Sequence, residues 1–147
     1  MGIPPNLLAL AHKAAITQSL APALVCAVVE QESGWNPWAI RYEPAFFTKY
    51  VAPLYTNNKI TATEAWARGF SWGLMQVMGQ VARESGFDAS FLSALCDPEQ
   101  GLVVGCKVLR KKLDAARSDT TQALQAWNGG GNPTYAAQVI ARKQRYT

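Results

Sequence analysis

The chain has 147 residues, of which 49% are hydrophobic and 16% are charged. A chain of this length and composition can bury one core without disulfides or a structural metal, so we expect a single domain over residues 1–147. The net charge of +4 suits an anionic polymer as partner, and the lack of any apolar run near the roughly 20 residues of a membrane span excludes stable membrane insertion.

The cysteines and the histidine predict neither a disulfide framework nor a metal site. Cys26, Cys96 and Cys106 form no CxxC pair and stand among apolar neighbours. Buried free thiols are therefore favoured over a bridge between Cys96 and Cys106. The single histidine, His12, stands beside alanine and lysine and offers no convincing triad or metal site. We expect no metal and no cofactor.

Helix-type periodicity and frequent turn residues predict a mainly α chain. A first helix is expected from Pro4 and Pro5 to about residue 19, and a second from Pro22 to Gly34, because proline fits the first helical turn and glycine ends helices. Between residues 35 and 60 the helical spacing disappears, and this stretch holds three prolines and seven aromatic residues. It predicts a long ordered aromatic loop or a small hairpin.

Three capping boxes predict where later helices begin. Thr61, Asp97 and Asp119 each precede a Glu or Gln by three residues, so helices should begin near 62, 98 and 120. The helix after Asp97 should pack centrally, because it carries an apolar stripe. That stripe consists of Leu102, Gly105, Cys106, Leu109 and Leu113. The run 128–132 breaks the chain, and Pro133 starts a last helix.

One carboxylate falls on the buried face of the second predicted helix. Glu32 lies four residues past Val28 and seven past Val25, on the apolar stripe. Glu30 points about 200° away, toward solvent. Burial and the negative end of the helix dipole both disfavour the ionised form, so we predict a raised pKa for Glu32, as a general acid requires. The alternative is a glutamate that turns out to water or pairs with Arg41.

Four short motifs follow one another along the chain. They are Glu32-Ser33-Gly34-Trp35-Asn36-Pro37, Gly73-Leu74-Met75-Gln76, Ala126-Trp127-Asn128-Gly129-Gly130, and Tyr135 with Val139. Each alone is common, but in this order they are specific, and they resemble the motifs of soluble lytic transglycosylases and related goose-type lysozymes. The resemblance spans roughly residues 22–141. It implies a compact, mainly helical α+β fold of the lysozyme type with a substrate cleft, and cleavage of the glycan strands of bacterial peptidoglycan.

The resemblance also implies a role for each matching residue. Glu32 would act as the single catalytic acid and base, and the Tyr135 hydroxyl would hydrogen-bond to it. Ser33 would orient a substrate or intermediate group, and Met75 would form an apolar wall. Together with Ser33 and Tyr135, the remaining matched residues would bind substrate: Gly73, Leu74, Met75, Gln76, Trp127 and Asn128.

The reaction implied by the resemblance cleaves the bond between N-acetylmuramic acid and N-acetylglucosamine and leaves 1,6-anhydro ends. A hydrolytic muramidase is the alternative, because inverting hydrolysis needs a second carboxylate about 6.5–9.5 Å from the acid. Glu43 is the candidate for that carboxylate, although we favour a structural Glu43 that pairs with Arg41 or with loop backbone. A non-catalytic peptidoglycan-binding module is a further alternative, against which the retained Glu32 and Gln76 argue.

Two departures from the family pattern refine the expectation. Trp127 stands where tyrosine is commoner, which keeps the aromatic wall but loses the hydroxyl. The segment between Glu32 and Gly73 is longer than in many relatives, and it is similar to phage or prophage members. Because no signal peptide is recognised, we expect a phage endolysin that stays in the host cytoplasm until a holin releases it to the periplasm and cell wall.

The distribution of charge along the chain indicates which kind of partner the protein binds. The basic groups at 110–112 and 142–145 are expected on solvated helix faces. No predicted helix concentrates Arg, Asn and Gln on an exposed face, so we expect no nucleic-acid partner. The expected partner is the peptidoglycan glycan strand, bound by a monomer.

Overall fold

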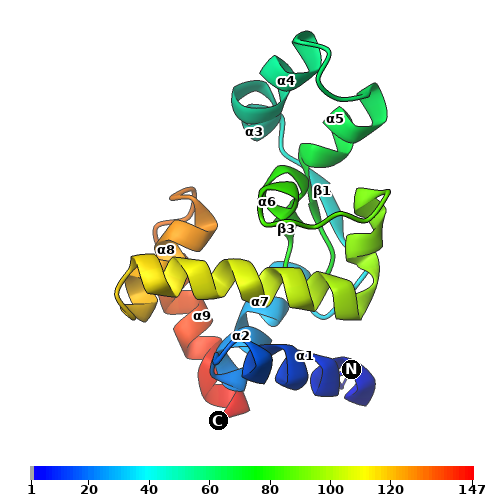
Figure 1. The fold of residues 1–147 in the computed structure, drawn as a ribbon. Helices are drawn as coiled ribbons and strands as arrows, with labels where there is room; N and C mark the ends of the chain where they lie inside the picture. The colour runs from blue at the N-terminus through cyan, green and yellow to red at the C-terminus, as the bar shows by residue number, and fades with distance from the viewer. Residues whose placement is uncertain (1) are drawn as a thin grey trace.

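The computed structural model describes residues 2–147, and it is mostly helical with a small sheet, as predicted. Figure 1 shows a lower group of helices and a smaller lobe above it. The lower group contains α1 (Pro5–Thr17), α2 (Pro22–Ser33), α7 (Pro98–Ala115), α8 (Thr120–Asn128), α9 (Tyr135–Lys143) and the 3-10 helix η3 (Gln144–Tyr146). The upper lobe contains α3 (Pro44–Phe46), the π-helix η1 (Phe47–Val51), α4 (Ala52–Thr56) and α5 (Ala62–Arg68).

A three-stranded antiparallel sheet connects the two groups. Its strands are β1 (Ile40–Tyr42), β2 (Phe70–Trp72) and β3 (Val77–Met78), in the order β1-β2-β3. Arg41 pairs with Ser71, and Ser71 pairs with Met78 on its other side. The helices α6 (Gly79–Glu84) and η2 (Leu92–Cys96) then lead into α7. Because β2 and β3 flank residues 73–76, the sheet fixes where that turn lies.

The loop prediction for residues 35–60 was wrong for residues 44–56, which are helical. These helices have three to five residues each, too few to show a repeating apolar face in the sequence. Aromatic packing holds them in place. The Phe47 and Trp66 rings stack with centroids 5.0 Å apart, and Tyr42 lies 5.3 Å from the Phe70 ring. The small hairpin expected in this stretch is also wrong, because β1 is its only strand and pairs with β2, which follows α5 in the chain.

The three predicted caps are confirmed. The side chains of Thr61, Asp97 and Asp119 accept hydrogen bonds from the backbone N–H groups three residues on. Each bond satisfies an N–H that would otherwise lack a partner at a helix start. The apolar stripe of α7 is buried throughout, which confirms its central position.

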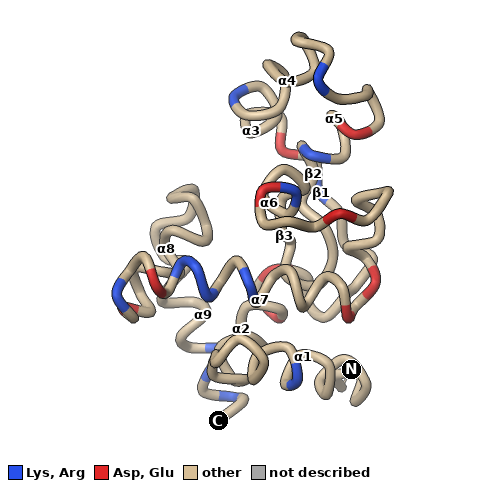
Figure 2. The backbone as a smooth tube through the Cα atoms, in the orientation of Figure 1, with Lys and Arg blue, Asp and Glu red and all other residues tan. Residues whose placement is uncertain are grey.

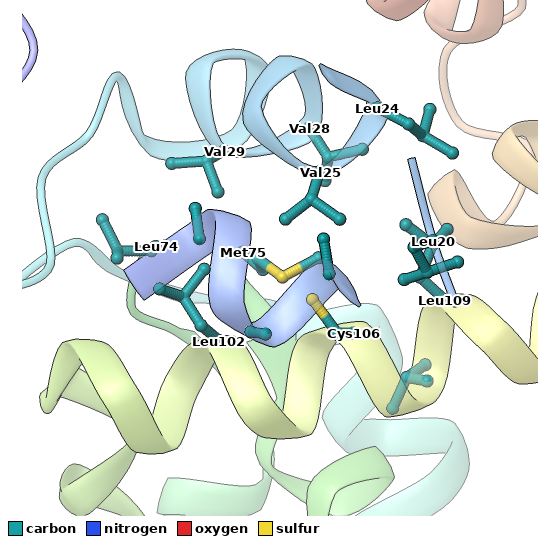
Figure 3. Close-up of a cluster of buried hydrophobic side chains, with 14 of the residues drawn as sticks. Leu20, Leu24, Val25, Val28, Val29, Leu74, Met75, Leu102, Cys106 and Leu109 are labelled. Atoms are coloured by element: carbon teal, nitrogen blue, oxygen red, sulfur yellow. The ribbon is translucent and has the colours of Figure 1, made fainter. Parts of the chain in front are cut away.

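The core lies between α2 and α7, with the turn at residues 73–76 inserted between them. In Figure 3, Met75 lies between two parts of the core, with Val25 and Val28 of α2 on one side and Cys106 of α7 on the other. A Cβ at Gly105 would lie 2.3 Å from the Met75 sulfur, so this glycine allows α7 to approach. Met75 is fully buried.

The three cysteines are free and buried, as predicted. Burial raises the pKa of Cys26 to about 11 and that of Cys106 to about 12, so both stay protonated thiols near neutral pH. Within residues 2–147, no helix combines the length and the apolar character needed to cross a membrane.

Candidate active site

Glu32 lies in the last turn of α2, and its carboxyl receives hydrogen bonds from two distant parts of the chain. The Tyr135 hydroxyl donates to Oε1 at 2.6 Å, and the Trp127 indole N–H donates to the same oxygen at 3.0 Å. Glu32 is half-buried and Tyr135 is buried. The ends of α2 and α8 and the start of α9 therefore meet at one carboxyl group.

Local sequence explains why these side chains meet. The apolar stripe through Val25 and Val28 turns Glu32 toward the interior. Gly34 ends α2 with φ of 58°, and Gly129 ends α8 with φ of 77°, conformations that glycine adopts without strain. The short connection from α8 to α9 then carries Trp127 and Tyr135 to the same side of the molecule.

The environment raises the pKa of Glu32 above its ordinary value. Burial is the largest cause, because it disfavours the charged carboxylate. The hydrogen bonds from Tyr135 and Trp127 and the charge of Arg41 lower the pKa, and the charge of Glu43 raises it. The net result confirms the prediction from the helical wheel: Glu32 keeps its proton to a higher pH than an exposed glutamate.

Arg41 and Glu43 form an ion pair at the edge of this site. The Arg41 Nε lies 3.1 Å from a Glu43 carboxylate oxygen, which is the structural pairing favoured from the sequence. The backbone N–H of Glu43 also donates to the Gly69 carbonyl at 2.9 Å. Glu43 is therefore anchored through its backbone and paired through its side chain, while its charge still acts on Glu32.

The turn at residues 73–76 is held by the side chains predicted to bind substrate. Ser33 Oγ lies 2.8 Å from the Leu74 carbonyl oxygen, which fastens the end of α2 to the turn. The Gln76 amide donates to the carbonyls of Ala39 and Gly73, both at 2.9 Å, and accepts from the Ser71 hydroxyl at 2.8 Å. The Ser33 hydroxyl and the Gln76 amide therefore make hydrogen bonds within the protein.

The apolar wall predicted for Met75 is wrong for this structure. Met75 is 0% exposed and Leu74 is 1% exposed, because the turn points both side chains into the core between α2 and α7. Gly73 is buried as well, and a Cβ there would lie 2.4 Å from the Leu95 carbonyl oxygen. Residues 73–75 therefore belong to the core and present almost no side-chain surface to a ligand.

Asn128 has a comparable internal role. With its amide oxygen turned toward the glycine-rich loop, it accepts from the backbone N–H groups of Asn132 at 2.8 Å and Gly131 at 3.1 Å. These bonds close the loop between α8 and α9. They set the spacing between Trp127 and Tyr135, the two donors to Glu32.

The sequence profile of the transglycosylase SLT domain family matches residues 9–146. The chain belongs to this family. Its members are lytic transglycosylases that act on peptidoglycan, so the domain is an enzyme of this class, and its α+β architecture is of the lysozyme type. No curated protein and no solved structure matches the chain.

The donor role of Trp127 in this transglycosylase domain was not predicted from the sequence. Tryptophan in place of the family's commoner tyrosine loses the hydroxyl, yet its indole N–H reaches Glu32 at 3.0 Å. The change therefore keeps a hydrogen-bond donor. The signal available in the sequence was that tryptophan carries an N–H, which needs a partner when the ring is partly buried.

Glu30 was expected to face solvent, and this was wrong. Its carboxylate lies 2.6 Å from Arg142 and 3.1 Å from Arg145, and it accepts a hydrogen bond from the Tyr146 hydroxyl at 3.1 Å. Part of the C-terminal basic group, at the chain end in Figure 2, is therefore paired. This cluster fastens η3 and the end of α9 to α2, the helix that carries Glu32.

The Glu30 cluster predicts acid-sensitive stability. Burial raises the pKa of Glu30, but the hydrogen bonds from Arg142 and Tyr146 and the arginine charges outweigh it and hold the pKa below its ordinary value of 4.5. The stabilisation is therefore present above pH 4.5 and is lost as pH falls through the lowered pKa. Glu30→Gln should lose about 1–3 kcal/mol near neutral pH, and the difference should shrink in acid.

Urea unfolding at several pH values measures this difference. The control is Glu99→Gln, because Glu99 and Lys13 are 62% and 75% exposed in their side chains and lie 3.9 Å apart. Such a surface pair contributes little. A Glu30 variant as stable as the control at pH 7 would contradict the proposed clamp.

Two cavities of the domain lie away from Glu32. One of about 40 Å³ lies between α1 and α7, and one of about 170 Å³ is lined by α5, Trp72 and residues 90–93. Neither includes Glu32, Trp127 or Tyr135. Within residues 2–147, no three His, Cys, Asp or Glu side chains are grouped as a metal site would require. The candidate site is therefore defined by the hydrogen bonds around Glu32.

Proposed function

We propose that Glu32 is the single acid and base with which this lytic transglycosylase cleaves peptidoglycan and leaves 1,6-anhydro-N-acetylmuramic acid ends. One observation carries the proposal. The Glu32 carboxyl is held by two donors on Oε1, while burial raises its pKa. A raised pKa favours the protonated form that a general acid needs, and the two donors hold the carboxyl in one orientation, so the site serves both requirements of general acid catalysis.

The proposed reaction needs no water. Glu32 protonates the oxygen that links N-acetylmuramic acid to N-acetylglucosamine, and that bond breaks. The acetamido group of the N-acetylmuramic acid stabilises the cationic centre at C1. The Glu32 carboxylate then takes the proton of the C6 hydroxyl as its oxygen bonds to C1, which closes the anhydro ring and restores the protonated acid.

Glu43 is not required in this scheme. Hydrolysis with inversion needs a second carboxylate as general base, and Glu43 is the carboxylate whose charge acts on Glu32. Its pairing with Arg41 at 3.1 Å supports a different role, in which the two opposite charges act on the pKa of Glu32 in opposite directions. The test must therefore distinguish the products of a transglycosylase from those of a hydrolytic muramidase.

The test is mass spectrometry of muropeptides released from purified sacculi by the wild type and by Glu43→Gln. We expect anhydro ends, lighter by one water than reducing ends, from both enzymes, and a rate for Glu43→Gln close to that of a Glu99→Gln control. Reducing ends together with a loss of about 10²–10⁴-fold in Glu43→Gln would identify a hydrolase instead. The absence of any released product would favour a binding module.

The endolysin role, the dependence on a holin and the monomeric state stay predictions. The endolysin prediction is supported by the long segment between Glu32 and Gly73, which resembles that of phage or prophage members. The net charge of +4 suits the anionic cell wall.

A further inference from the structure

Two hydrogen bonds to Glu32 end on the same oxygen. The Tyr135 hydroxyl and the Trp127 indole both donate to Oε1, at 2.6 and 3.0 Å. The other carboxyl oxygen, Oε2, receives no hydrogen bond from a side chain or backbone group within residues 2–147. The two oxygens of this carboxyl are therefore not equivalent.

We infer that Trp127 is a positioning residue that acts through Glu32: together with Tyr135 it fills Oε1, and this leaves Oε2 as the oxygen that carries and transfers the proton. The inference rests on the proposed role of Glu32 as acid and base. It gives Trp127 a function that differs from that of an aromatic wall for sugars.

The chemistry of the two donors shows why Trp127 decides the position of the proton. A phenol hydroxyl can donate or accept, so Tyr135 alone would allow the proton on either oxygen by rotating its O–H. An indole N–H can only donate. The hydroxyl oxygen of a protonated carboxyl is a weaker acceptor than its carbonyl oxygen, so an N–H that can only donate favours the carbonyl at Oε1 and the O–H on Oε2.

The charged and titratable groups near Glu32 come from separate elements. Tyr135 faces it from α9, Arg41 from β1 and Glu43 from the residue after β1. Burial and the neighbouring Glu32 raise the pKa of Tyr135, so the phenol stays protonated at neutral pH. Trp127 carries no charge at any pH, so its removal changes one hydrogen bond and leaves these charges in place.

The test uses Trp127→Phe, which keeps an aromatic ring and removes the N–H. Its matched control is Trp72→Phe, which removes an indole N–H that donates to the Ala67 carbonyl at 2.8 Å, away from Glu32. We expect Trp127→Phe to lower kcat by about 10- to 100-fold with KM little changed. The alkaline limb of its pH profile should move to higher pH, because the carboxylate loses a donor. The control should show neither effect.

A sugar-wall role makes different predictions. In that role Trp127→Phe would lose sugar contacts and raise KM, and its pH profile would stay unmoved because the Trp127 N–H would have no influence on the titration of Glu32. An unmoved alkaline limb in Trp127→Phe, equal to that of Trp72→Phe, would overturn the inference.

A second measurement does not depend on turnover. The carbonyl stretch of protonated Glu32 is identified by infrared difference spectroscopy as the band lost in Glu32→Gln. In Trp127→Phe it should move to higher wavenumber, because the carbonyl oxygen Oε1 loses one of two donors, and in Trp72→Phe it should not move. An unmoved band in Trp127→Phe would overturn the inference. A moved band without anhydro products would overturn the proposed function and leave the proton assigned to Oε2.

Discussion

The Glu32→Gln variant is expected to lose turnover by at least about 10²–10⁴-fold, the usual contribution of a general acid and base. Glutamine has nearly the same shape and keeps an oxygen to accept from Tyr135 and Trp127, but it has no proton to transfer. The rate of muropeptide release measures the loss, and sedimentation with purified sacculi measures binding, which should be retained. Turnover near that of the wild type would remove Glu32 from the proposed mechanism.

The same variant should be more stable than the wild type at neutral pH. The pKa of Glu32 is raised in the folded protein, so the folded state binds this proton more tightly than the unfolded state. The wild type therefore loses stability as pH rises through the raised pKa, whereas glutamine does not ionise. Thermal unfolding should show a higher Tm for Glu32→Gln at pH 7 and a smaller difference below pH 4.5.

Glu30→Gln serves as a matched control on the same helix. The pKa of Glu30 is lowered in the folded protein, so replacing this glutamate by glutamine should decrease the Tm at pH 7. Changes of equal sign in the two variants would contradict the electrostatic contrast between Glu30 and Glu32.

Gly73→Ala is expected to have the largest effect on stability, a loss of about 2–5 kcal/mol from the sum of backbone strain and overpacking. Gly73 has φ of 73°, and an added Cβ would lie 2.4 Å from the Leu95 carbonyl oxygen. That oxygen belongs to the backbone, so a side-chain rotation cannot relieve the contact. Urea unfolding measures the loss.

Gly129→Ala separates the two causes. Gly129 has φ of 77°, close to that of Gly73, but nothing lies within 4 Å of an added Cβ. Gly129→Ala should therefore lose only about 1–2 kcal/mol of stability, the cost of the left-handed backbone conformation. Equal losses in the two variants would show that the close approach of Leu95 contributes nothing to stability.

The inward direction of Glu32 could be predicted from the sequence, because it depends on local periodicity. An apolar stripe on a helix turns a residue four positions past Val28 toward the same face wherever the helix packs. The raised pKa follows from that burial. The capped starts at Thr61, Asp97 and Asp119 are local in the same sense, since each bond joins residues three positions apart.

The partners of these residues could not be predicted in the same way. Trp127 and Tyr135 are 95 and 103 residues from Glu32 in the chain, and Arg142 is 112 residues from Glu30. The family resemblance implied the Tyr135 bond, but the periodicity of α2 holds no information about which distant donors reach it.

The capped helix starts and the inward-facing Glu32 follow from the sequence, because caps and stripes depend on residues close together in the chain. The family follows from the order of the four motifs along the chain. Three other features are visible only in the folded protein: Met75 lies in the core, Glu30 is paired with arginines, and Trp127 donates to Glu32. Each of these depends on how α2, α7, α8 and α9 approach one another. That approach is set by side-chain packing summed over the whole core, which no local pattern encodes.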